Sequence, residues 1–494
     1  MIYEVFFVIV KTGREQLLSY LEDTSNIPGD ASVLYIPQNL SELQSIIKDC
    51  ADKKIPVTLS AGRTGTTGGC IALSGAIISL ENFKAILNID AENRLAYLES
   101  AVTLGQLASA AAAKGLKFAA ASTEELSCIG GAVATCASGV RGFGYGSIRD
   151  YVTEIKILLT SGELLAIKRG EIFARKRHFD FGLSGRKFTF DLPGYAMPRV
   201  KHQAGYSVRD DMDLIDLFIG SEGTLGIIVE VVLKLQPLPF SVLDGLLFFE
   251  SENKALEFAE GLRGLKAKKS LSPVALEYFD SRSLEFLKPK NSFIPSECQG
   301  AIYFEHEASD GKTLNLLQDE FYALSLWHKA MLDESIFATS NDERKRIFEF
   351  RHSLPQAINE FLRQHKQVKV ASDIAVPEHN FAKMYEYYLY AAQAGKMPYV
   401  NFGHIGECHL HFNFLPRTDV EQEQARELLF DLCRKAVGLG GTVSAEHGIG
   451  KIKKPYLKIL YSDDDIRKMA AVKKYFDPAG ILNLDNVFDK SFLG

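Results

Sequence analysis

Three glycine-rich segments in the first half of the chain limit most strongly how it can fold. They span residues 60–69, 127–139 and 218–227, and the first follows directly on the apolar run 55–59, which is typical of a strand. Glycine lets backbone amides approach a phosphate because no Cβ stands in the way, and threonine hydroxyls add donors. The first segment is neither a P-loop, since no Gly-Lys-Ser/Thr follows, nor a GxGxxG dinucleotide motif. A single segment is usually only a tight turn, but three in one domain are not easily explained in that way.

Strands and helices alternate over residues 1–238, and we predict that this part forms one αβ domain. The apolar stretch 2–10 predicts a buried strand rather than a signal peptide, because it is short and lacks a basic leader. Residues 168–200 interrupt the alternation, and Lys and Arg outnumber Asp and Glu there. We expect this stretch to be an inserted, partly ordered loop.

A second α+β domain is predicted over residues 239–450, after a pair of prolines. Its candidate strands, at 246–249, 274–279 and 301–305, are separated by stretches with helical spacing. The last part, 451–494, is predicted to be a helix and an extended tail that return to the first domain.

The composition of the chain excludes several functional classes. A net charge of −6 over 494 residues gives no electrostatic footprint for nucleic acid. No apolar run approaches the roughly 18 residues that a transmembrane helix needs. Seven cysteines are scattered without a CxxC pair, so neither a disulfide framework nor a thiolate cluster is predicted. We therefore expect a cytoplasmic protein, and both a homodimer and peripheral attachment to a membrane are compatible with these features.

Four of the eleven histidines gather late in the chain, at positions 404, 409, 411 and 447. Glu446 precedes the last of them, and imidazole nitrogens with a carboxylate suit Zn²⁺ or Mn²⁺. A histidine beside such an ion can also move a proton at physiological pH. His409 and His411 are two apart on a predicted strand, so both face the same side. A lone histidine is usually a core or surface residue, so the prediction concerns the cluster rather than each member.

The order and spacing of these motifs resemble the FAD-linked D-2-hydroxyacid dehydrogenases of the vanillyl-alcohol-oxidase superfamily. That family includes D-lactate dehydrogenase, the glycolate oxidase flavoprotein subunit and D-2-hydroxyglutarate dehydrogenase. The resemblance implies an α+β fold, with a two-subdomain PCMH-type FAD-binding domain and an α+β substrate domain, or cap, built on an antiparallel sheet. The motifs that carry it are Ala61–Gly65, Ile129–Thr135, Tyr145–Val152, Ile219–Gly226, His404…His411, Glu446-His447-Gly448 and Phe476-Asp477-Pro478…Asn483.

The resemblance implies that FAD lies along the glycine segments. Residues 61–65 would wrap its pyrophosphate and residues 128–139 would line the flavin and the ribityl chain. No histidine or cysteine stands where a flavin tether is expected, so FAD is expected to be non-covalent. Arg63 replaces the usual Gly or Asn, and it could pair with a phosphate or point to solvent. The implied FAD-binding residues are Ala61, Gly62, Arg63, Thr64, Gly65, Gly68, Cys128, Gly130, Gly131, Thr135, Ser138, Gly139, Ile227 and Asn483.

The resemblance also implies roles for the histidine cluster. His404, His411 and Glu446 would bind a divalent metal, Zn²⁺ or Mn²⁺, and His447 would be the acid/base.

The chain departs from the family pattern between the two outer histidines. Glu407, Cys408 and His409 stand where Asp, Gly and Asn are usual. His409 could be an extra metal ligand, a substrate contact or a partner of a ligand. Cys408 alternates to the opposite face and is expected to be packed.

A 2-hydroxyacid carries a carboxylate, which calls for cations in the substrate site. The resemblance assigns substrate binding to Arg351, Lys369 and Asn413, with His409 as a further candidate. Arginine binds a carboxylate through two parallel hydrogen bonds, although Arg351 could equally be a solvated helix residue beside a run of charges at 344–346. Lys366 is a rival to Lys369.

The implied reaction is oxidation of a D-2-hydroxyacid, such as D-lactate, to the 2-oxoacid. The metal would lower the pKa of the hydroxyl, His447 would take its proton, and the α-hydrogen would leave as hydride to flavin N5. No NAD motif and no iron–sulfur cysteines are present, so the electron acceptor is expected to be external: a quinone, an electron-transfer flavoprotein, a cytochrome or oxygen. Residues 168–200 could contact a membrane or a partner, or form a solvated loop.

Two other functions fit the same motifs. Alkyl-glycerone-phosphate synthases use this flavin fold for a transfer with no net redox change. Alternatively, the chain could be the flavin subunit of a larger complex that needs a partner for turnover. The side-chain specificity among lactate, glycolate, 2-hydroxyglutarate and longer acids stays open.

Overall fold

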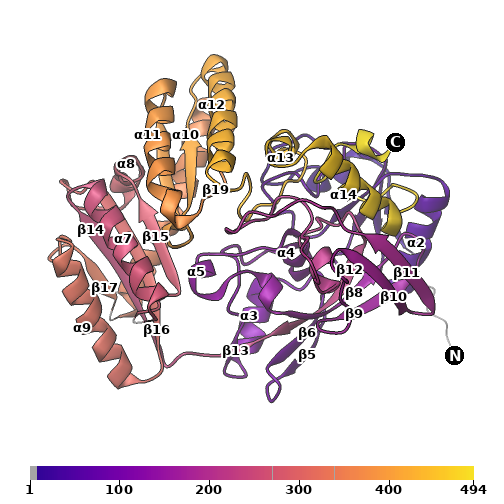
Figure 1. The fold of residues 1–494 in the computed structure, drawn as a ribbon, viewed down its shortest axis with the longest axis horizontal. Helices are drawn as coiled ribbons and strands as arrows, with labels where there is room; N and C mark the ends of the chain where they lie inside the picture. The colour runs from indigo at the N-terminus through magenta and orange to yellow at the C-terminus, as the bar shows by residue number, and fades with distance from the viewer. Residues whose placement is uncertain (1–7, 270, 339) are drawn as a thin grey trace.

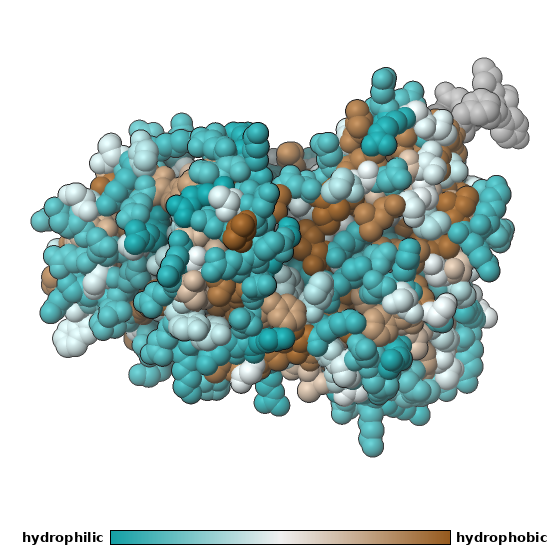
Figure 2. Space-filling view, turned by 90° about the horizontal axis from the view of Figure 1, so that it is seen from above, coloured by the Kyte–Doolittle hydropathy of each residue, from teal (hydrophilic) through white to brown (hydrophobic). Residues whose placement is uncertain are grey.

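The computed structural model describes residues 8–269, 271–338 and 340–494, which form two bodies that lie side by side (Figure 1). The right-hand body in that view contains the N-terminal half of the chain and its C-terminal end, and the left-hand body contains the segment between them. Seen from above, hydrophobic side chains gather where the two bodies meet, while hydrophilic side chains dominate the left body (Figure 2). Within the described ranges, no helix is both long enough and apolar enough to cross a membrane.

A four-stranded sheet with the order β1-β2-β4-β3 opens the first domain. Of the predicted strand at 2–10, residues 2–7 lie outside the described ranges, and β1 pairs antiparallel with β2. Helix α2 packs on the sheet through the side chains at 43, 46, 47 and 50, as their helical spacing predicts, and Asn39 caps its first turn. The elements are β1 Ile9–Lys11, α1 Arg14–Leu17, β2 Val33–Ile36, α2 Leu40–Asp52, β3 Val57–Ser60 and β4 Ala76–Ser79.

An antiparallel five-stranded sheet follows, with the order β5-β6-β12-β8-β9. Helices α3 and α4 pack against this sheet, and α4 lies within the second glycine segment (Figure 1). The elements are β5 Ile86–Asp90, β6 Leu95–Glu99, α3 Leu104–Ala112, β7 Leu116–Lys117, α4 Ile129–Thr135, α5 Gly142–Tyr145, β8 Val152–Leu158, β9 Leu164–Lys168, α6 Ile215–Phe218, β12 Ile227–Lys234 and β13 Gln236–Pro237.

The basic insert differs from the predicted partly ordered loop. It forms an ordered hairpin of β10 (His178–Leu183) and β11 (Arg186–Asp191). Alternating phenylalanines place their rings on one face of the hairpin, where Phe190 lies 4.9 Å from Tyr475 and 5.1 Å from Phe476, ring centre to ring centre. Burial of these aromatic rings holds the segment in place. The phenylalanines recur at every second residue, which is typical of a strand, but the prediction gave more weight to the excess of basic residues.

The second domain is built on an antiparallel sheet with the order β17-β14-β16-β15-β20-β21-β18, and β19 pairs with β21. This agrees with the expected α+β cap, and helices α7 to α12 pack against it (Figure 1). The strands are β14 Ser241–Phe249, β15 Ala275–Phe279, β16 Gly300–Ala308, β17 Ile336–Ala338, β18 Val370–Ala371, β19 Ile374–Ala375, β20 Tyr399–Gly403 and β21 His409–Phe414. The helices are α7 Glu252–Ala267, α8 Ser281–Leu287, α9 Gly311–Trp327, α10 Asn341–Gln364, α11 Phe381–Gly395 and α12 Asp419–Gly438.

The C-terminal segment contacts the first domain again. After α13 (Lys454–Leu460) and α14 (Asp463–Phe476), the tail runs beside β3, where Asn483 accepts a hydrogen bond from the amide of Leu59 at 2.8 Å. The buried ammonium of Lys473 donates to the carbonyl of Thr224 at 2.9 Å. Just after the Glu446-His447 pair, the amides of Ile449 and Gly450 donate to the carboxylate of Glu222 in the third glycine segment, both at 2.7 Å.

Candidate active site

A cavity in the first domain is lined by all three glycine segments and extends to the Glu446-His447 pair. Three residues implied for FAD binding do not line it. Gly68 faces Ile27, Gly139 faces the carbonyl of Ala121, and the side chain of Ile227 is buried in the core. Ile228 lines the cavity instead, because side chains alternate along β12. The implied residues that do line it are Ala61, Gly62, Arg63, Thr64, Gly65, Cys128, Gly130, Gly131, Thr135, Ser138 and Asn483.

Two glycines of the cavity wall face open space. Gly65 and Gly131 both line the cavity, and a Cβ built on either would meet no heavy atom of the described chain within 4 Å, sequence neighbours aside. The protein itself therefore leaves that space open, as a cradle for a ligand would. Arg63 also lines the cavity, and its guanidinium lies 4.7 Å from the ring centre of Tyr20 and donates to the carbonyl of Ala61.

Two cysteines, Cys70 and Cys128, also line the cavity. Burial raises the pKa of both thiols, that of Cys70 to about 12. A thiol that stays protonated is a poor nucleophile.

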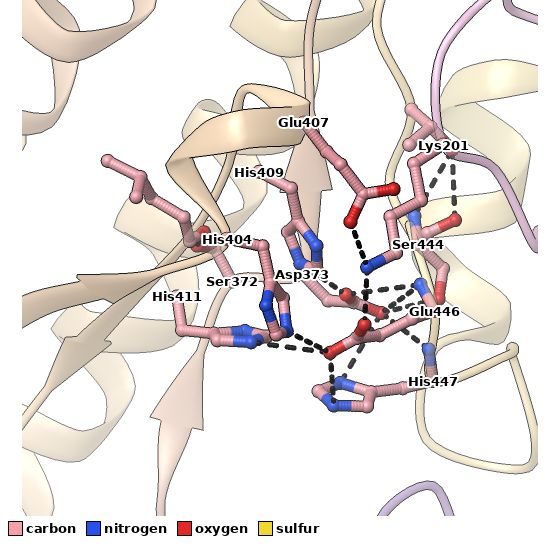
Figure 3. Close-up of polar contacts among 12 residues, drawn as sticks. Lys201, Ser372, Asp373, His404, Glu407, His409, His411, Ser444, Glu446 and His447 are labelled. Carbon is pink, nitrogen blue, oxygen red and sulfur yellow. Dashed lines mark hydrogen bonds and ion pairs between the residues drawn. The ribbon is translucent and has the colours of Figure 1, made fainter. Parts of the chain in front are cut away.

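Glu446 lies at the centre of the polar cluster (Figure 3). Its Oε1 lies 3.1 Å from Nε2 of His404, 3.4 Å from Nε2 of His411 and 3.7 Å from Nε2 of His447. Burial would raise the pKa of this carboxyl, but His404 and the ammonium of Lys201 hold it well below its usual range. The structure thus brings together the residues implied as metal ligands and the implied base.

Lys201 is a member of the site that the sequence did not reveal. Its buried ammonium donates to Glu446 Oε2 at 2.7 Å and to Glu407 Oε2 at 2.9 Å (Figure 3). Burial would lower the pKa of Lys201, but the two carboxylates outweigh it and raise that pKa. Its partners lie more than 200 positions away in the sequence, so no local pattern marks it.

Glu277 on β15 is a second residue that the sequence analysis missed. One of its oxygens accepts from Nε of Arg351 at 2.5 Å, and the other lies 2.5 Å from Nδ1 of His404. Burial would raise the pKa of Glu277, but Arg351 and His404 hold it well below its usual range. An acid inside the apolar strand ALEYF was a signal that could have revealed it.

Asp373 is a third buried carboxylate of the site, after Glu446 and Glu277. Its Oδ2 accepts from Lys453 Nζ at 2.7 Å and from Ser444 Oγ at 2.8 Å, and it lies 3.3 Å from Nδ1 of His447. Its Oδ1 lies 2.9 Å from Nε2 of His409. Burial lowers the pKa of His447 to about 4, against the effect of Asp373. His447 is therefore uncharged near neutral pH, and its Nε2 can accept a proton.

The residues implied for substrate binding surround this cluster. Asn413 follows His409 and His411 on the same face of β21, and its Nδ2 donates to the carbonyl of His411 at 2.8 Å. Lys369 is exposed to solvent next to β18. Lys366 is exposed, in a left-handed turn. Cys408 is buried, in agreement with the prediction that it is packed.

Comparisons with known proteins agree with this architecture. Residues 31–168 match the FAD binding domain family, and residues 245–487 match the family of FAD linked oxidases, C-terminal domain. The chain is 27% identical to the glycolate oxidase subunit GlcD of Bacillus subtilis (strain 168), over 92% of this chain and 88% of that protein. It is 29% identical to the D-lactate dehydrogenase of Anaerostipes hadrus, over 96% of this chain and 93% of that protein. A solved structure of p-cresol methylhydroxylase shares the fold with a TM-score of 0.69 at 13% identity, over 98% of this chain and 94% of that one.

Proposed function

The chain belongs to the FAD-linked oxidases, and we propose that it oxidises a D-2-hydroxyacid to the 2-oxoacid. One observation carries the proposal: Glu446 and His447 line the same cavity as the glycine segments. A proton acceptor and the site for a hydride acceptor therefore meet at one point, as removal of a hydroxyl proton and an α-hydrogen requires. The printed names of two relatives, a glycolate oxidase subunit and a D-lactate dehydrogenase, support a 2-hydroxyacid as the substrate class.

FAD, held without a covalent bond by the residues of the cavity, would supply the hydride acceptor. The electrons would then leave to an external acceptor, such as a quinone, an electron-transfer flavoprotein, a cytochrome or oxygen. The protein's own contribution is to hold the substrate against the flavin site and to take the hydroxyl proton.

Arg351 is the proposed anchor of the substrate carboxylate. Its Nε donates to Glu277, and this contact fixes the plane of the guanidinium so that the terminal nitrogens can hold a carboxylate. Glu277 also contacts His404, so the same carboxylate positions both the proposed substrate anchor Arg351 and a proposed metal ligand. Asn413 and Lys369 are further substrate contacts in this proposal.

The residues of the cluster fit a divalent cation, and His404, His411 and Glu446 would hold it. Imidazole nitrogens and a carboxylate oxygen are donors that suit Zn²⁺ or Mn²⁺. When bound, the ion would supply Lewis-acid polarisation of the substrate hydroxyl.

His447 would act as the base. Its Nδ1 faces Asp373, which favours the tautomer with the proton on Nδ1 and leaves Nε2 free to accept the hydroxyl proton. Lys453 and Ser444 hold the Asp373 carboxylate in position from the other side. The positive charge that His447 gains would be stabilised by Asp373 and Glu446.

Turnover of the purified, FAD-loaded chain with an artificial dye acceptor tests this proposal. We expect 2-oxoacid to form from at least one of D-lactate, glycolate and D-2-hydroxyglutarate, and not from L-lactate. Arg351→Met should raise KM roughly 10- to 100-fold, because the carboxylate loses its paired hydrogen bonds. The matched control is Arg363→Met, an exposed arginine on the same helix, which should leave KM unchanged. Equal KM values for both variants would contradict the role of Arg351, and a lack of product from every acid would contradict the proposed function.

A further inference from the structure

His409 is the member of the histidine cluster that the proposed reaction does not use. It begins β21, and its side chain is fully buried. It neighbours His411 on the same face of the strand, so both rings point into the cluster (Figure 3).

The rings of His404, His409 and His411 are spaced like ligands of one ion. Their ring centres lie 5.2 Å apart for 404 and 409, 5.4 Å for 404 and 411, and 4.6 Å for 409 and 411. A metal–nitrogen bond of about 2 Å places imidazole centres roughly 3 Å from the ion and roughly 4.5–5 Å from one another. The three observed separations are close to that range.

The nitrogens of His409 also lack ordinary partners. Nε2 lies 2.9 Å from Asp373 Oδ1, yet neither ring nitrogen makes a well-aligned hydrogen bond to any part of the chain that the structure describes. A buried ring nitrogen without a hydrogen bond is costly, and an ion at the cluster would give one nitrogen of His409 a partner. Donor atoms of Asp373, His409, His411 and Glu446 all lie within 4.8 Å of one another, which is compact enough to surround a cation.

We propose that His409 is a direct ligand of the divalent cation, so that three imidazoles, those of His404, His409 and His411, surround it together with Glu446. The inference rests on the proposed function, since that function places a cation at this cluster. Asp373 remains the support of His447, because Lys453 and Ser444 already hold its Oδ2. The competing arrangement is a hydrogen bond from His409 to Asp373 with no contact to the ion.

X-ray absorption of the FAD-loaded, full-length protein with bound Zn²⁺ counts the imidazole ligands directly. We expect three in the wild type and two in His409→Asn. Competition with a chelator should show a loss of Zn²⁺ affinity on the order of 100-fold or more in that variant. His328→Asn, at the end of α9 and away from the cluster, should bind Zn²⁺ like the wild type.

Two imidazoles in the wild type, or unchanged Zn²⁺ affinity in His409→Asn, would overturn the proposal, as would a wild type that binds no Zn²⁺. If His409→Asn does not fold, the count in the wild type still decides between three ligands and two. Neither readout uses turnover. Two imidazoles on an enzyme that oxidises its substrate would reject only the role of His409, whereas three on an inactive protein would reject only the proposed oxidation.

Discussion

Flavin reduction by the substrate is expected to slow by about 10²- to 10⁴-fold when His447 is replaced by asparagine, the range that a positioned general base contributes. Asparagine has a similar shape but cannot accept the hydroxyl proton that His447 Nε2 would take. Asp373 keeps its contacts to Lys453 and Ser444, so the surrounding structure should persist. Stopped-flow absorbance of the flavin, after anaerobic mixing with the substrate, measures this rate.

The control for this variant is FAD content, because His447 lines the cavity that would hold the cofactor. FAD should stay bound in His447→Asn, with an oxidised spectrum like that of the wild type. His365→Asn, which alters a histidine at the C-terminal end of α10, should reduce its flavin at the wild-type rate. Rapid bleaching in His447→Asn would show that another group takes the proton.

Replacement of Glu277 by glutamine is expected to destabilise the second domain and to impair activity together. Glu277 is buried, and it faces Arg351 and His404 at the same time. Removal of one partner of a buried ion pair costs about 3–5 kcal/mol, because the remaining charge stays buried without compensation. At about 2–4 °C per kcal/mol for a domain of this size, the melting temperature should fall by roughly 6–20 °C. Differential scanning calorimetry of the FAD-loaded protein measures this change.

A double variant separates the stability effect from the functional one. Glu277→Gln with Arg351→Met removes both charges, so it should recover part of the lost melting temperature. It should not recover activity, because the substrate anchor is then absent. A double variant no more stable than Glu277→Gln alone would contradict the role of Glu277 as the counterion of Arg351.

Local patterns predicted much of the fold. The spacing of side chains in α2, the glycine segments after β3 and around α4, and the strands predicted at 246–249, 274–279 and 301–305 all match the structure, while the antiparallel order of the second sheet was implied by the family resemblance. These features depend on residues that are close in the sequence. The spacing of apolar residues and the presence of turn-forming residues can be recognised in a single sequence. The hairpin of β10 and β11 was missed because its charge excess was given more weight than its alternating phenylalanines.

The charged residues that hold the site residues in position were harder to predict, because their partners are distant in the sequence. Lys201, Glu277 and Asp373 act through partners that the fold brings from distant parts of the chain. Glu446 and His447 were predictable because they neighbour each other in the sequence. By contrast, Ile227 was expected at the cavity, but Ile228 lines it. To tell which of two neighbouring side chains faces inward, the exact register of the strand must be known.

The central claim is that the cavity and the histidine cluster form one site that moves a hydride and a proton from the same substrate. Anaerobic mixing of the FAD-loaded protein with the best D-2-hydroxyacid, followed by flavin absorbance and product analysis, tests it most directly. The flavin should bleach completely, with one 2-oxoacid formed per FAD. A flavin that stays oxidised, or one that changes its spectrum while no 2-oxoacid appears, would contradict it.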